Sequence, residues 1–162
     1  MAIITGVGEL FLEEILQGRH TLDEGSPSDT VRVALFGPNS SIGPTTAAYA
    51  TTGLNEVSGG GYVAGGPTIV LEVVGKVGSA RAGGAQFSNG AYIQPTLVTN
   101  ITFTGAAARG IMVYNVTQSN RNIFTLDFGQ NLVPISGVQI NWAIGDVANW
   151  SDVLIPLVGR SI

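Results

Sequence analysis

The sequence contains no cysteine and a single histidine among its 162 residues. Without cysteine, neither a disulfide framework nor a thiolate metal site can form. One histidine cannot build a zinc site, and nothing in the sequence pairs His20 with a nucleophile for a serine-type mechanism. A lone histidine in a turn is more typical of a capping or surface residue. We therefore expect no catalytic residue, no metal, no cofactor and no enzymatic activity.

Charged residues are also scarce, at 11% of the chain against about 25% in an ordinary soluble domain. A free monomer of this size normally keeps a charged surface for solubility. The deficit therefore favours an exterior that is largely covered by other protein subunits. The alternative is a neutral surface of threonine, serine and asparagine, which many β-sandwich proteins have.

The charges that are present exclude two kinds of partner. The net charge is −4, with Lys76 and six scattered arginines, so no basic stripe is available for nucleic acid. No apolar run approaches the roughly 20 residues that span a bilayer. Glu9, Glu13 and Glu14 near the start are unlike the basic region of a secretory signal. We expect a protein that is made in the cytoplasm and binds neither nucleic acid nor membrane.

Helical periodicity is confined to residues 8–18. Phe11, Leu12, Ile15 and Leu16 fall on one face of this segment, and its glutamates lie largely elsewhere. Gly18 is well placed to end the helix. Because so short a helix is marginal alone, its apolar stripe is expected to dock on this domain or on a neighbouring subunit.

From residue 29 onward apolar residues alternate with a period of two, as in Val31, Val33 and Leu35. Glycine, proline, asparagine and serine clusters separate the alternating runs, and strands do not alternate with helices. The pattern predicts a mainly β fold, an antiparallel β-sandwich or jelly roll of about seven to eight strands with one short N-terminal α-helix. The predicted strand ranges are 30–36, 68–74, 91–98, 100–104, 111–116, 123–128 and 138–144.

Three regions follow from this pattern. Residues 1–28 form an N-terminal helix and turn, residues 29–145 a β-sandwich domain, and residues 146–162 an apolar C-terminal extension or arm. The loop 37–66 is longer than an ordinary connection in a compact domain, so we expect it to be a functional loop or an arm. Its glycines fit either a close backbone approach or a flexible loop. In the extension, Pro156 restricts the apolar run to an edge strand or an arm.

Motifs for metal or phosphate chemistry are incomplete. Asp23, Glu24 and Asp29 lack the spacing of a calcium loop and are better explained as a solvated turn. The glycines at 59–66 lack the phosphate-loop pattern. Asp127 begins an Asp-Phe-Gly tripeptide as in protein kinases, but the other kinase motifs are absent, so a strand end or an Asx turn is expected there.

The order of several short motifs resembles that of a known group of proteins. The motifs are Gly-x-His at 18–20, DTVRVALF at 29–36, TTAAY at 45–49, NEVSG at 55–59, GYVAGG at 61–66, ARG at 108–110, VYN at 113–115, LDFG at 126–129 and VQINW at 138–142. They look like those of small β-rich virion structural proteins of tailed bacteriophages, of the capsid decoration or cement type. The resemblance covers about residues 9–145. Relative to that pattern, residues 75–89 look like an insertion, and the tail 146–162 is longer.

The resemblance implies a viral structural protein without catalytic residues. It would sit on the capsid surface of the virion as a decoration or cement protein and contact the major capsid protein and its own copies, as a homotrimer. The residues predicted to anchor these contacts are Phe11, Leu12, Ile15, Leu16, Tyr62, Val153, Leu154, Ile155, Leu157 and Val158. The alternative is a tail- or fibre-associated virion module that binds a host-surface glycan through an aromatic platform drawn from Trp142, Trp150, Tyr62, Tyr92 and Tyr114.

Overall fold

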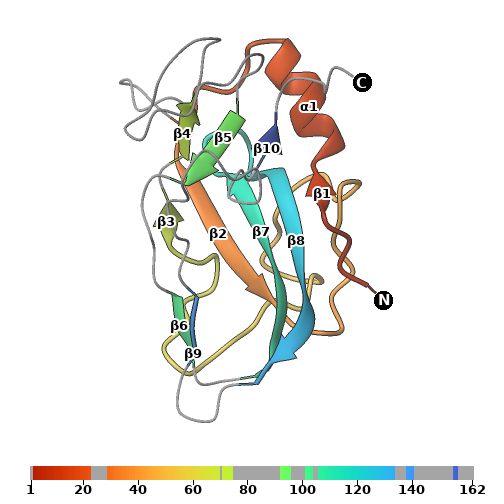
Figure 1. The fold of residues 1–162 in the computed structure, drawn as a ribbon, viewed down its shortest axis with the longest axis vertical. Helices are drawn as coiled ribbons and strands as arrows, with labels where there is room; N and C mark the ends of the chain where they lie inside the picture. Colours follow the sequence, from red (N-terminus) through yellow and green to blue (C-terminus); the bar gives the residue numbers. More distant parts are fainter. Residues whose placement is uncertain are drawn as a thin grey trace, which may run out of the picture.

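The computed structural model describes residues 2–22, 29–69, 71–74, 92–95, 101–103, 106–133, 138–140 and 155–156. Within these ranges the chain is mainly β with one short helix, which confirms the predicted mainly β class and the predicted N-terminal helix (Figure 1). The elements are β1 (Gly6–Val7), α1 (Glu9–Leu16), β2 (Val31–Phe36), β3 (Thr68–Ile69), β4 (Leu71–Val74), β5 (Tyr92–Pro95), β6 (Ile101–Phe103), β7 (Ala108–Asn115), β8 (Arg121–Leu132), β9 (Val138–Ile140) and β10 (Ile155–Pro156).

The centre of the fold is a five-stranded antiparallel sheet in the order β1-β8-β7-β2-β3. β2 pairs with β7 along its whole length, and β7 and β8 form a long hairpin. Its turn places Ser119 and Asn120 at positive φ, 54° and 58°, a conformation that asparagine tolerates better than most residues. β7 and β8 both begin before the predicted ranges 111–116 and 123–128, and β8 runs on to Leu132.

Two smaller antiparallel sheets complete the described strands: β10-β5-β4 and β6-β9. β10 pairs with β5 at the edge of its sheet, so the C-terminal apolar run pairs within the chain at Ile155 and Pro156. An edge position suits Pro156, because proline has no N–H to give to a second neighbour.

The first face of the large sheet carries the larger core. Val31, Val33 and Leu35 of β2 point to this face, as their alternation predicts, and pack with residues of β7 and β8. Each such aliphatic side chain contributes about 1.5–3 kcal/mol when it leaves water. Phe11 of α1 and Leu22 close this core from the N-terminal segment.

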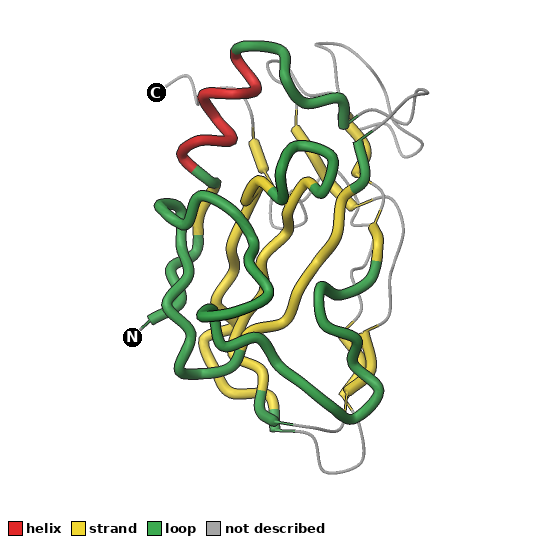
Figure 2. The backbone as a smooth tube through the Cα atoms, turned by 180° about the vertical axis from the view of Figure 1, so that it is seen from behind, coloured by secondary structure: helices red, strands yellow, loops and turns green. Residues whose placement is uncertain are grey.

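The second face of the sheet is buried as well, because the loop 37–66 covers it. Ala34 and Phe36 of β2 pack there against Ile42 and Tyr49 of the loop, and the Tyr49 ring stacks on Tyr114 with centroids 4.4 Å apart. Figure 2, which shows the molecule from behind, shows this loop crossing the strands. The loop is thus a layer of the fold that protects a second apolar surface.

A carboxylate and two tyrosines fasten the end of that loop to β2. Tyr49 and Tyr62 donate hydrogen bonds of 2.7 Å to the two oxygens of Glu56, and the Gly65 N–H donates to the same carboxylate. The Tyr62 hydroxyl in turn accepts the Leu35 N–H. Burial first, and then the bond to Glu56, raise the pKa of both tyrosine hydroxyls above the usual 10, so both stay protonated donors.

Candidate interaction surface on helix α1

Helix α1 begins and ends at glycines for different reasons. At Gly8 the chain lies so close to β8 that a Cβ atom would overlap the Asn122 carbonyl oxygen. Gly18 adopts a φ of +69° and closes the helix, as predicted, with its N–H bonded to Ile15 O and the Arg19 N–H bonded to Glu14 O. These two bonds are the Schellman arrangement, in which a left-handed residue satisfies the last helical carbonyl groups.

The helix is rotated relative to its apolar stripe. Phe11 is fully buried and Ile15 packs partly against the core, but Leu12 is 43% exposed and Leu16 is 88% exposed. Glu14 faces inward instead and is 8% exposed. Leu10 is also exposed, so three leucines of an eight-residue helix lie outward. The predicted docking stripe is therefore split: Phe11 and Ile15 face the core, whereas Leu12 and Leu16 face solvent.

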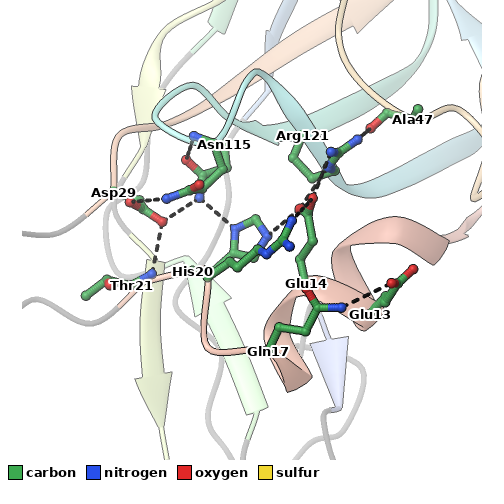
Figure 3. Close-up of polar contacts among 11 residues, drawn as sticks. Glu13, Glu14, Gln17, His20, Thr21, Asp29, Ala47, Asn115 and Arg121 are labelled. Atoms are coloured by element: carbon green, nitrogen blue, oxygen red, sulfur yellow. Dashed lines mark hydrogen bonds and ion pairs between the residues drawn. The ribbon is translucent and has the colours of Figure 1, made fainter.

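An ion pair between the helix and the sheet keeps the helix in this rotation. The Arg121 guanidinium, at the start of β8, donates two hydrogen bonds of 2.8 Å to the two oxygens of Glu14 (Figure 3). Hydrogen bonding to Arg121, with a further contribution from His20, holds the pKa of Glu14 below its usual 4.5, against the effect of burial. Arg121 also donates to the Ala47 carbonyl oxygen, so the pair joins the helix, the hairpin and the loop 37–66.

His20 is part of the same network, with a fully buried side chain. The expectation of a capping or surface residue is therefore wrong. Its ring packs edge-on against Phe11, its Nε2 lies 3.0 Å from Glu14 Oε2, and its Nδ1 lies 2.9 Å from Asn115 Nδ2. An amide nitrogen can only donate, so Nδ1 accepts and Nε2 carries the proton that is donated to Glu14.

The orientation of the Asn115 amide is itself determined by its neighbours. Asn115 Nδ2 also donates to Asp29 Oδ2 at 2.7 Å, and Asn115 Oδ1 accepts the Gln118 N–H at 3.2 Å. A flipped amide would set two oxygens against each other at Asp29, so Asn115 Nδ2 is the donor and His20 Nδ1 is the acceptor of their hydrogen bond. Asp29 accepts a further bond from the Thr21 N–H, so it is structural; Asp23 and Glu24 lie outside the described residues.

This network holds the helix in place against the sheet. Its polar groups bond to one another, and the one imidazole is inaccessible to solvent. The described ranges contain no group of three or more His, Asp or Glu side chains that could hold a metal ion. None of the helices in those ranges is long and apolar enough to cross a membrane. Asp127 makes the expected bond to the Gly129 N–H and pairs with Arg109 on the surface.

Comparison of the chain with protein-family models, curated proteins and solved structures found no match.

The other predicted anchors and platform residues are placed as follows. Tyr62 is buried and fastens the loop, and Tyr114 is buried under Tyr49, so neither ring is open to a glycan. Ile155 belongs to β10. The remaining predicted anchors and both tryptophans, namely Val153, Leu154, Leu157, Val158, Trp142 and Trp150, lie outside the described residues.

The sequence gives no sign that Glu14, Arg121 and Asn115 belong to one hydrogen-bond network. The two ends of the Glu14–Arg121 pair lie 107 positions apart in the chain, and no local pattern links them. The one available signal was His20 itself, a titratable residue six positions after Glu14 and next to a helix end.

Proposed function

We propose that this chain is a structural protein of a tailed-bacteriophage virion, a capsid decoration or cement protein. In this role it stabilises the head through contacts with the major capsid protein and with its own copies in a homotrimer. We further propose that the smaller sheets pack on the five-stranded sheet as the second layer of a β-sandwich.

The observation that supports this proposal most is the outward apolar face of α1. Leaving a leucine in water forgoes about 1.5–3 kcal/mol of burial free energy. Leu12 and Leu16 nevertheless lie outside, while the Glu14 carboxylate takes the inner position. Exposed leucines gathered on one element are typical of a surface that another protein covers.

The composition supports the same reading. With 11% charged residues, the chain has less charge than a free domain of its size normally keeps. Many contacts of modest strength, repeated over a closed lattice, would give the mechanical stability that a cement protein supplies.

Heads of the phage that encodes the chain provide the direct test. Purified heads that lack the protein should bind added protein to saturation, and the decorated heads should release their DNA at a higher temperature than bare heads. Cryo-electron microscopy of the intact particle should place the chain on the head. Density on the tail alone, or no binding to heads, would contradict the proposal.

Deletion of residues 147–162 tests the contribution of the apolar tail. We expect the shortened chain to remain soluble and β-rich by circular dichroism but to lose trimerisation or binding to expanded heads. The full-length protein prepared in parallel is the control. A shortened chain that decorates heads normally would show that the tail takes no part in the contact.

A further inference from the structure

The N-terminus of helix α1 has no capping side chain of its own. Its N-cap residue is Gly8, where no side-chain hydrogen bond is made. The Glu9 N–H donates to the Pro44 carbonyl oxygen, but the N–H groups of Leu10 and Phe11 have no acceptor among the described residues. Phe11 is fully buried, so its N–H cannot be hydrated from the surface. A buried N–H of this kind needs a partner inside the fold.

Asn122 of β8 occupies the space in which a capping side chain would stand. Its Cγ lies 3.5 Å from the position that a Cβ atom on Gly8 would take, and the residue is 1% exposed. A capping asparagine, aspartate, serine or threonine bonds to the N–H of the second or third helical residue. In α1 these two residues are Leu10 and Phe11. The Asn122 amide is thus placed beside the two N–H groups that lack an acceptor.

The oxygen of this amide is the group that remains to face the helix. Asn122 Nδ2 donates to Gly43 O at 3.0 Å and to Thr46 O at 2.9 Å, which uses both of its hydrogens. A flipped amide would set Oδ1 against these two carbonyl oxygens, so the orientation is fixed. Oδ1 is buried and accepts no hydrogen bond in the part of the chain that the structure describes. A buried acceptor without a bond is costly.

We propose that one buried water molecule joins Asn122 Oδ1 to the N–H groups of Leu10 and Phe11. The bridging group must accept from an N–H and donate to an amide oxygen, and water does both. An anion, the usual ligand of a helix N-terminus, has no hydrogen to donate to Oδ1. Two accepted bonds and one donated bond give the water about three partners, as is typical of buried waters.

The bridge makes Asn122 a joint between three segments of the fold. Its Nδ2 holds the loop 37–66 through two carbonyl oxygens, its backbone belongs to β8, and its Oδ1 holds the first turn of α1 through the water. The amide thereby supplies from the sheet the cap that Gly8 cannot provide. This inference concerns how α1 is held and does not rest on the proposed function.

Water-selective NMR spectra of the full-length chain, labelled with nitrogen-15, test for the bound water. We expect the Phe11 amide proton to show a water cross-peak of opposite sign in NOE and ROE spectra, which is the signature of a long-lived bound water. The Ile15 amide, inside the same helix, is the control and should show none. The absence of a water cross-peak at both Leu10 and Phe11 would overturn the proposal. A crystal structure in which Oδ1 bonds directly to either N–H would overturn it as well.

Hydrogen exchange separates capping of the helix from anchoring of the loop. Asn122→Ala removes both, and we expect exchange of the Phe11 amide to rise at least about tenfold. Thr46→Ala, the matched control, loses the 3.0 Å bond from the Gly43 N–H to Thr46 Oγ1 in the same loop but keeps Asn122 Oδ1. It should change Phe11 exchange by less than about twofold. Equal changes in the two variants would contradict the cap, and if Asn122→Ala does not fold, the spectra of the wild-type chain decide.

Discussion

At Gly66 the loop 37–66 passes so close to β2 that a Cβ atom would overlap the Val33 carbonyl oxygen, and its φ is +67°. At Gly59 the φ is also positive, at +82°, but nothing lies within 4 Å of a Cβ atom. The two glycines therefore serve different needs. Gly66 permits a close backbone approach, whereas Gly59 only permits a turn.

This difference predicts unequal effects of adding one methyl group. Gly66→Ala should lower the free energy of unfolding by more than about 3 kcal/mol, because the loop must move away from β2. Gly59→Ala, the matched control, should cost about 1–2 kcal/mol for the left-handed backbone alone. Urea denaturation of the two variants measures both values. Equal losses would mean that the loop does not approach β2 at Gly66.

Glu14 links stability to pH, because its pKa is held below 4.5 in the folded chain by Arg121 and His20. A depressed carboxyl pKa contributes stability that is fully present above the unfolded value and is lost as the pH falls through the folded value. The stability difference between wild type and Glu14→Gln should therefore be constant near pH 6–7 and shrink below about pH 4.5. Denaturant titrations at several pH values measure it.

Glu13→Gln is the control for this titration, because Glu13 is an exposed carboxylate on the same helix that bonds only to Gln17 in the described structure. A difference between wild type and Glu14→Gln that grows toward acid pH would contradict the assignment of Glu14 as a paired carboxylate.

At the scale of the element, α1 shows that a stripe of apolar residues does not fix the rotation of a short helix. The choice lies between burying Leu12 and Leu16 and burying the Glu14 carboxylate against Arg121. A carboxylate left buried without its partner costs about 3–5 kcal/mol. The position of Arg121 at the base of β8, together with His20, therefore decides the rotation.

Two neighbouring residues of α1 test this rotation. Phe11→Ala should lower the free energy of unfolding by about 3–5 kcal/mol, because Phe11 is fully buried. Leu12→Ala should cost under about 1 kcal/mol, because nearly half of the side chain is already in water. Thermal and urea unfolding of the two variants give both values. Comparable losses at the two positions would contradict the observed rotation.

At the scale of the molecule, the N-terminal segment and the loop 37–66 help to bury both faces of the five-stranded sheet. β1 pairs with β8, the Asp127 N–H donates to Thr5 Oγ1, and Thr125 Oγ1 donates to the Ile4 carbonyl oxygen. The Ile4 N–H bonds to Ile42 O, which ties the same segment to the loop. Residues 2–8 thus join the edge of the sheet to the layer behind it.

Removal of residues 1–7 should therefore destabilise the whole molecule by more than about 2 kcal/mol, since several hydrogen bonds of about 1 kcal/mol each are lost. The uncovered edge of β8 should also promote association of strands. Urea denaturation and size-exclusion chromatography of the shortened and full-length chains measure the two effects. A shortened chain that is as stable and as monodisperse as the full chain would contradict this role.

The local features of this protein are encoded in short stretches of its sequence. The alternation of Val31, Val33 and Leu35, the end of α1 at Gly18, and the antiparallel β class with one helix all follow from periodicity and turn residues a few positions apart. Such features depend on near neighbours, so a single sequence carries them.

Which side of each element is covered depends instead on contacts between residues that lie far apart in the chain. Burial of Glu14 depends on Arg121, 107 positions away, and burial of His20 depends on Asn115, 95 positions away. Burial of Ala34 and Phe36 likewise depends on where the loop 37–66 lies. Periodicity shows which face of an element is apolar. In the folded chain a buried ion pair can turn part of that face toward solvent, and a covering loop can bury the opposite face as well. The exposed leucines of α1 are a result of such an ion pair.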